Sequence, residues 1–204
     1  VVPLSEMQKI YEGALLWNIP VHLDGARLFN AAHTLNCKAS EIAQYADSVM
    51  FCLSKGLAAP VGSMLVGTED FISRARKMRK IMGGGMRQAG IIAAPCLVAL
   101  NEMRERLKED HIHAQMIAQA FARESDVFHV NQHETQINMV FVKLKPPYNT
   151  QDTLQPLLES YSILTYPPEN ATYRFVTHYG IEENQIHYMC RSIPAIAEQL
   201  RRES

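Results

Sequence analysis

The sequence lacks the features that mark several broad classes of protein. No apolar stretch approaches the roughly 18 residues that a membrane-spanning helix requires. The 20 Lys and Arg residues are balanced by 21 Asp and Glu, so no strongly basic surface is available to neutralise a nucleic-acid backbone. We therefore expect neither a membrane nor a nucleic acid as a partner. The chain starts at Val1 without a signal-type segment, so we expect it to be an internal part of a longer polypeptide.

Cysteine and histidine are too sparse or too unfavourably spaced to predict a metal site. The 4 cysteines are far apart and form no CxxC pair, which favours free thiols in a reducing compartment such as the cytoplasm. His111 and His113 are close in sequence, but residues two apart in a helix-like segment point to different faces. We expect no metal ion.

The first half of the chain alternates short apolar runs with amphipathic segments. Buried strands are predicted where near-continuous apolar runs are bounded by polar or turn residues, at 21–23, 49–53 and 62–67. Helices are predicted at 4–17, from Arg27, after Ser40 as a cap, at 71–81 and at 88–109. This order predicts an α/β domain with helices on both faces of a parallel or mixed sheet.

The second half has the pattern of a smaller α+β domain. Helices are predicted at 111–124, 153–160 and 182–202. Strands are predicted at 127–130, 137–143, 163–166 and 173–178. We place the boundary between residues 107 and 108, which gives domains of 1–107 and 108–204.

Two charged residues follow predicted strands of the first domain. Asp24 comes directly after the first strand, and Lys55 comes two residues after the second, in a loop of Gly, Ala and Pro. Open α/β sheets bind ligands at the carboxyl ends of their strands. A lysine that emerges from a buried strand is expected to be buried, which favours the neutral amine that forms a Schiff base. Gly56 and the segment 60–62 would let a planar ligand approach the backbone closely.

An aspartate and a lysine on neighbouring strand ends are a minimal site for pyridoxal 5′-phosphate (PLP). The lysine holds the cofactor covalently, and the carboxylate keeps the pyridine nitrogen protonated, so that the ring accepts electrons. Spacing alone does not establish this hypothesis. A buried structural Lys–Asp pair is the more common arrangement, and Asp24 is equally suited to cap a helix.

Three motifs in the first domain resemble successive signatures of the low-specificity L-threonine aldolase family. They are 22–27 (His-Leu-Asp-Gly-Ala-Arg), 54–63 (Ser-Lys-Gly-Leu-Ala-Ala-Pro-Val-Gly-Ser) and 83–90 (Gly-Gly-Gly-Met-Arg-Gln-Ala-Gly). The resemblance extends to 173–178 (Tyr-Arg-Phe-Val-Thr-His). It implies an aspartate-aminotransferase-like fold, in which 1–107 is the C-terminal part of the PLP-binding large domain with its mostly parallel sheet.

The resemblance implies a role for each residue near the cofactor ring. Lys55 would hold PLP, and Asp24 would pair with its pyridinium nitrogen. Ala26 would lie against one face of the ring, where a larger side chain would not fit. Ser54 would bond either the PLP phosphate or the backbone of its own loop.

Four basic residues also match family positions. Arg27 and Arg174 would bind the substrate α-carboxylate through two parallel hydrogen bonds each, a planar geometry that lysine lacks. Lys80 and Arg87 would lie near the PLP phosphate of a neighbouring subunit. From the residues alone, Lys80 is equally suited to a solvated helix face, Arg87 to capping the glycine turn and Arg174 to a surface ion pair.

The reaction implied by the resemblance is retro-aldol cleavage of L-threonine, L-allo-threonine and related β-hydroxy amino acids to glycine and an aldehyde. The enzyme would be a homodimer or a homotetramer. The family's phosphate loop and ring-stacking histidine have no match in residues 1–20. We expect that part of the site upstream of Val1 or on a separate chain, and without it the fragment is expected to bind PLP weakly or not at all.

Three alternatives remain open. A related β-eliminating lyase, racemase or transaminase would use the same lysine. A nucleotide-binding protein that uses Gly83–Gly85 as a phosphate cradle is disfavoured, because the dinucleotide fingerprint requires glycine where Gln88 stands. A truncated paralogue that acts only as an interaction subunit would explain the missing upstream part, whereas intact Asp24 and Lys55 favour retained chemistry.

Overall fold

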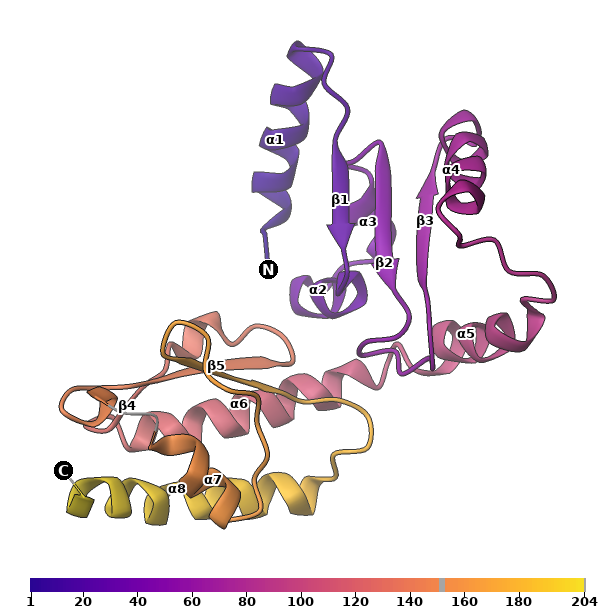
Figure 1. Ribbon diagram of the computed structural model, residues 1–204. Helices are drawn as coiled ribbons and strands as arrows, with labels where there is room; N and C mark the ends of the chain where they lie inside the picture. Colours follow the sequence, from indigo (N-terminus) through magenta and orange to yellow (C-terminus); the bar gives the residue numbers. More distant parts are fainter. Residues whose placement is uncertain (151–152, 204) are drawn as a thin grey trace. The chain divides into compact units, whose positions relative to one another are not determined.

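The computed structural model describes residues 1–150 and 153–203 (Figure 1). Contacts between Cα atoms divide the chain into two compact units, Val1–Lys108 and Glu109–Ser204, which we call unit 1 and unit 2. Each unit has a three-stranded sheet of its own. Within the described residues no helix combines the length and the apolar character that crossing a bilayer demands. That the units are the large and small domains of a PLP enzyme remains a prediction.

Unit 1 is built on a mixed sheet with the strand order β1–β2–β3. The strands β1 (His22–Gly25) and β2 (Ser48–Cys52) run parallel, and β3 (Ser63–Gly67) is antiparallel to β2. The helices are α1 (Leu4–Leu16), α2 (Leu28–Leu35), α3 (Ala39–Ala43), α4 (Glu69–Ile81) and α5 (Gly90–Glu102), and α6 (Leu107–Arg123) begins in this unit. The predicted positions of the three strands and of the helices at 4–17 and 71–81 are confirmed.

One face of this sheet is covered by helices. Its apolar residues pack with the buried residues of α2 and α3 in a single cluster, which includes Leu23, Val49, Phe51, Leu28, Ala32 and Ile42. Successive residues of a strand point to opposite faces, so His22 and Asp24 lie on the other face, where both are exposed. The end of β1 therefore presents a carboxylate to solvent.

Three predictions for unit 1 are wrong in detail. The strand at 62–67 is not buried, because all five residues of β3 are exposed. The helix predicted at 88–109 ends at Glu102 and a new one begins at Leu107, because the chain turns there and buries Leu107 in the core. Ser40 does not cap α3. The carboxylate of Glu41 accepts a hydrogen bond from the Lys38 N–H at 2.7 Å and fixes the start of that helix.

Unit 2 has an antiparallel sheet of β4 (Phe128–His129), β5 (Met139–Leu144) and β6 (Thr172–Val176) in that order. The helices α6, α7 (Leu154–Ser160) and α8 (Glu183–Glu203) contribute to its core. Buried Val140, Val142, Tyr173 and Phe175 alternate with exposed Phe141 and Arg174. One face of the sheet therefore packs on helices and the other is exposed. The predicted elements at 127–130, 137–143, 153–160, 173–178 and 182–202 are confirmed to within a few residues.

The predicted strand at 163–166 does not form, although the segment leads into β6. A bridge between Glu169 and Thr172 starts a hairpin, with N–H···O bonds of 3.1 and 3.0 Å. The next hydrogen-bonded pair of that ladder would join Pro167 to Arg174. Because proline has no N–H, the ladder stops there, and the outer edge of β6 is left without a paired strand among the described residues.

Candidate functional site

Asp24 and Lys55 lie at the same edge of the unit 1 sheet. β1 and β2 are parallel neighbours, with Gly25 opposite Phe51, so their carboxyl ends point the same way. Asp24 is the second-to-last residue of β1, and Lys55 lies in the loop that follows β2. The topology therefore brings together the amine and the carboxylate that the sequence placed on two strand ends.

Backbone hydrogen bonds within the loop that carries Lys55 hold it in a compact turn. The Ala58 N–H donates to the Lys55 carbonyl at 2.9 Å, and the Ala59 N–H donates to the Leu53 carbonyl at 3.0 Å. Leu53 and Ala59 are buried, so the loop is anchored in the core on both sides of the lysine. Lys55 itself is exposed, and the prediction that it is buried is wrong. Within residues 1–150 and 153–203 no hydrogen bond or ion pair engages its ammonium group.

Gly56 is required by packing. A Cβ built at this position would lie 2.7 Å from Leu107 Cδ2 and 3.3 Å from Asn30 Oδ1. Real Cβ atoms do not approach other atoms so closely, so a larger residue would displace Leu107 from the core. The small residue predicted to admit a planar ligand is thus explained by its contact with the first turn of α6.

Asp24 uses one of its two oxygens within the protein. Oδ1 accepts a hydrogen bond from the Ala26 N–H at 3.1 Å, which closes a turn at the end of β1. Asp24 is not the cap of α2, because that position is occupied by Arg27. In the described part of the chain, no hydrogen bond or ion pair engages Oδ2. One carboxylate oxygen is therefore available to a ligand.

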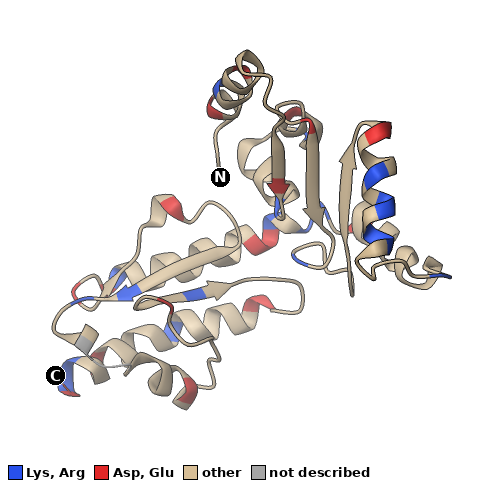
Figure 2. Cartoon of the chain, turned by 45° about the horizontal axis from the view of Figure 1, so that its top comes forward, with Lys and Arg blue, Asp and Glu red and all other residues tan. Residues whose placement is uncertain are grey.

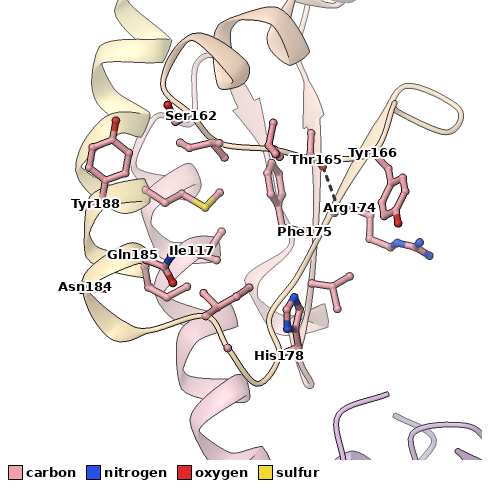
Figure 3. A pocket seen from close by; sticks show the side chains of 17 residues that line it. Ile117, Ser162, Thr165, Tyr166, Arg174, Phe175, His178, Asn184, Gln185 and Tyr188 are labelled. Carbon is pink, nitrogen blue, oxygen red and sulfur yellow. Dashed lines mark hydrogen bonds between the residues drawn. The ribbon is translucent and has the colours of Figure 1, made fainter. Parts of the chain in front are cut away.

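Arg174 lies in unit 2, on the exposed face of its sheet. It borders a groove of about 1260 Å³, whose lining comes mainly from β6, from α8 and from the segment 162–166. Figure 3 shows the Arg174 side chain directed away from the Phe175 ring, as the alternation of a strand requires. The same part of the chain contains His178, whose Nδ1 is 2.7 Å from the Tyr179 carbonyl oxygen.

Comparison with known proteins identifies the family. The β-eliminating lyase family model matches residues 1–145. The chain belongs to the β-eliminating lyase family. It is 37% identical over 190 residues to a probable low-specificity L-threonine aldolase 2 of Arabidopsis thaliana, a match that covers 92% of this chain and 53% of the relative. The chain spans about half the length of the low-specificity L-threonine aldolases of Arabidopsis thaliana that it matches.

The fold of this chain is also found in solved structures of PLP-dependent enzymes. A putative L-allo-threonine aldolase from Listeria monocytogenes superimposes with a TM-score of 0.78 at 20% identity, covering 96% of this chain and 57% of that one. An N-acetylornithine aminotransferase from Stenotrophomonas maltophilia gives 0.68 at 16% identity, covering 97% and 52%. The expected fold class is therefore confirmed.

The free groups of this family member suit a PLP site. An unbonded amine at Lys55 and an unbonded carboxylate oxygen at Asp24 stand at one sheet edge, and the Ser54 hydroxyl follows β2 next to the lysine. These are an amine for a covalent bond, an acceptor for a protonated ring nitrogen and a donor for a phosphate. Ala26, which is half-buried, is bonded to Asp24 through its N–H.

Lys80 and Arg87 are not joined to that site by any bond. Lys80 lies in the last turn of α4, a helix whose basic residues stand out in Figure 2, and Arg87 lies in the segment between α4 and α5. Both are exposed, and within residues 1–150 and 153–203 no hydrogen bond or ion pair engages either side chain. Arg27 lies at the start of α2, next to the Asp24 turn. Roles for these three residues stay predictions.

Proposed function

We propose that this chain forms the lysine-bearing part of a PLP-dependent threonine aldolase. The reaction would cleave L-threonine, L-allo-threonine and related β-hydroxy amino acids to glycine and an aldehyde. The observation that supports the proposal is that Lys55 and Asp24 follow or end two parallel neighbouring strands at one sheet edge, with the amine and one carboxylate oxygen unbonded among the described residues. Relatives named low-specificity L-threonine aldolase support this reaction over other PLP chemistry.

Some residues of the site would bind the cofactor and others would bind the substrate. PLP, when bound, stabilises negative charge that develops on the substrate. Lys55 would hold it covalently, and Asp24 Oδ2 would keep a proton on its ring nitrogen. Ala26 would leave space for the ring, and Ser54 would donate to the phosphate.

The substrate would be held through its α-carboxylate by Arg27 and Arg174. A guanidinium group offers two parallel N–H donors to a carboxylate, which fixes both the position and the direction of the amino acid. Such orientation decides which substrate bond breaks. We assign the catalytic base to neither candidate histidine. His22 Nδ1 lies 2.8 Å from the Ser48 hydroxyl and His178 Nδ1 lies 2.7 Å from a carbonyl oxygen, and these contacts do not involve Nε2 of either ring.

The complete enzyme would need more polypeptide than this chain and at least two subunits. Leu16 and Trp17 are 85% and 79% exposed, and β3 is exposed along its whole length. Apolar surface of this extent marks an interface. We propose that the rest of the enzyme, supplied as a separate chain or as the remainder of a longer one, covers it. Lys80 and Arg87 would reach the PLP phosphate of a neighbouring subunit in a homodimer or homotetramer.

Covalent labelling tests the proposal directly. The complete enzyme is incubated with PLP, reduced with borohydride and digested, and the modified peptide is located by mass spectrometry. Label is expected on Lys55, abolished by Lys55→Ala and retained in the matched variant Lys77→Ala, which removes an exposed lysine of α4. Label on another lysine, or none, would favour an interaction subunit.

Product analysis then separates the PLP reactions. L-threonine should yield glycine and acetaldehyde in equal amounts once the enzyme is complete. Release of a keto acid would indicate a transaminase, and release of ammonia would indicate a β-eliminating enzyme.

A further inference from the structure

Thr177 is the most completely bonded polar residue next to Arg174. It is 1% exposed. Its N–H donates to the Asn138 carbonyl at 3.1 Å, and its carbonyl accepts from Asn138 Nδ2 at 2.7 Å. Its hydroxyl donates to the Asp110 carbonyl at 2.6 Å. These bonds use the N–H, the carbonyl and the hydroxyl of one buried residue.

The partners of Thr177 belong to two different elements. Asn138 directly precedes β5, and Asp110 lies in the first turn of α6. Thr177 itself directly follows β6. The three residues, which we call the Thr177 clamp, therefore fasten the end of β6 to the neighbouring strand and to a helix on the covered face of the sheet.

β6 is the edge strand of its sheet, so its backbone is paired with β5 on one side only. On its open side the ladder stops at Pro167, which cannot donate to the Arg174 carbonyl. That carbonyl instead receives the Thr165 hydroxyl at a long 3.5 Å. Arg174 is thus carried by a strand that is paired on one side only, and the clamp lies three positions further along it.

Hydrophobic packing alone does not explain threonine at this position. Valine has nearly the same shape and would bury no hydroxyl, but with valine the carbonyl of the buried Asp110 would lose the donor that now lies at 2.6 Å. A hydrogen bond differs from apolar packing because it depends on direction and fixes a distance. The hydroxyl therefore restrains the position of β6 against α6 in a way that a methyl group would not.

We propose that Thr177 is a positioning residue for Arg174. Through Asn138 and Asp110 it fixes β6, so that the guanidinium group meets the substrate α-carboxylate without reorganisation. This inference rests on the carboxylate role proposed for Arg174. Displacements of about 1 Å at a binding group can cost on the order of 100-fold in rate, so a restraint at the strand end has a large effect on the site.

Three variants of the chain separate positioning from stability. Thr177→Val removes the hydroxyl and keeps the shape, and Thr177→Ser keeps the hydroxyl. Ser192→Ala is the matched control, since Ser192 is also buried in unit 2 and donates to the Tyr188 carbonyl at 3.0 Å, within α8. Amide hydrogen exchange of β6 and the Arg174 Nε–H signal are followed by nuclear magnetic resonance, without and with L-threonine.

Thr177→Val should speed exchange at the β6 amides about tenfold relative to Ser192→Ala and weaken the response of Arg174 to L-threonine by a similar factor. Thr177→Ser should restore both to within about threefold of the unsubstituted chain, as expected for a single buried hydrogen bond. Equal exchange in Thr177→Val and Ser192→Ala would overturn the inference. The response to L-threonine is measured on the complete enzyme, because this chain supplies only part of the site. If L-threonine does not perturb Arg174 there, the carboxylate role fails, whereas the exchange comparison still decides whether Thr177 fixes β6.

Discussion

Phe141 of β5 lies directly opposite Arg174 of β6, and both side chains are on the exposed face of the unit 2 sheet. Directly opposed residues of an antiparallel pair have Cβ atoms about 5 Å apart. A half-exposed aromatic side chain is therefore the cross-strand neighbour of the arginine that we propose binds the substrate. An apolar neighbour of this kind reduces the access of water to a bound carboxylate and strengthens its hydrogen bonds.

Arg174→Lys should raise the KM for L-threonine at least about tenfold and leave PLP binding unchanged. Lysine keeps the charge but loses the planar two-point contact with a carboxylate. Steady-state kinetics of the complete enzyme, together with its cofactor absorbance, give both quantities. The control is Arg202→Lys on α8, whose exposed side chain pairs with Glu198 and should not affect KM. A fall in PLP affinity would instead assign Arg174 to the phosphate.

Asp24→Asn should leave PLP bound but lower turnover by about 100-fold or more. The neutral amide no longer holds the proton on the ring nitrogen, and loss of one partner of a desolvated pair costs several kcal/mol, with each 1.4 kcal/mol worth about tenfold in rate. Asp47→Asn is the matched control, because Asp47 also accepts one backbone N–H, that of Val21, at 2.7 Å. Equal activity in the two variants would mean that Asp24 only closes its turn.

Mixing two inactive variants of the complete enzyme should restore activity if Arg87 serves a neighbouring subunit. Lys55→Ala and Arg87→Ala subunits would form heterodimers in which one site carries both lesions and the other is intact. Recovered activity is measured after verified subunit exchange and should approach the fraction set by random reassortment. If Arg87 serves its own subunit, every site keeps one lesion and no activity returns. An active monomer would also contradict the shared site.

Acid should weaken unit 2 through Asp126. Arg201 Nε and Nη2 bond both of its carboxylate oxygens at 2.9 Å, and this lowers the pKa of Asp126 from its ordinary value. The unfolded chain titrates at about 3.9, so the contribution is present above that pH and is lost as pH falls through the lower folded pKa. Arg201→Gln should therefore lower the thermal midpoint more at pH 7 than below pH 4.

The exposed ion pair of Arg202 gives a baseline for that measurement. Arg202→Gln removes a solvent-exposed contact with Glu198, and such pairs contribute little at any pH. A destabilisation by Arg201→Gln that stays the same at both pH values would show that Arg201 acts through packing rather than through the carboxylate.

The sequence predicted most elements because each is marked by local chemistry. Strands of unit 1 are continuous apolar runs, and the basic helix α4 ends before the glycines at 83–85. Local patterns failed where distant residues decide. The helix-favouring composition of 88–109 continues across the break between α5 and α6, which depends on the burial of Leu107 against the Lys55 loop. The segment 163–166 has strand composition, but Pro167 removes the donor that its ladder requires.

The candidate site was predictable to the extent that it follows from strand order. Parallel neighbours place Asp24 and Lys55 at one edge, and this required only that the two strands be adjacent. The exposure of Lys55 was missed, because burial of a strand says nothing about the loop after it. The Thr177 clamp had no sequence signal, since a threonine and an asparagine beside strands are ordinary, and their bonds join residues from distant parts of the chain.

The contact between Gly56 and Leu107 couples two positions that are remote in the sequence. A mutational scan would score Gly56 as a residue of the active site, because it directly follows Lys55 and any side chain there would collide with Leu107. The origin of that loss would be steric, and shortening Leu107 should make alanine tolerable at position 56. Among homologues, larger residues at 56 should accordingly occur together with smaller residues at 107, as a covarying pair that records packing rather than catalysis.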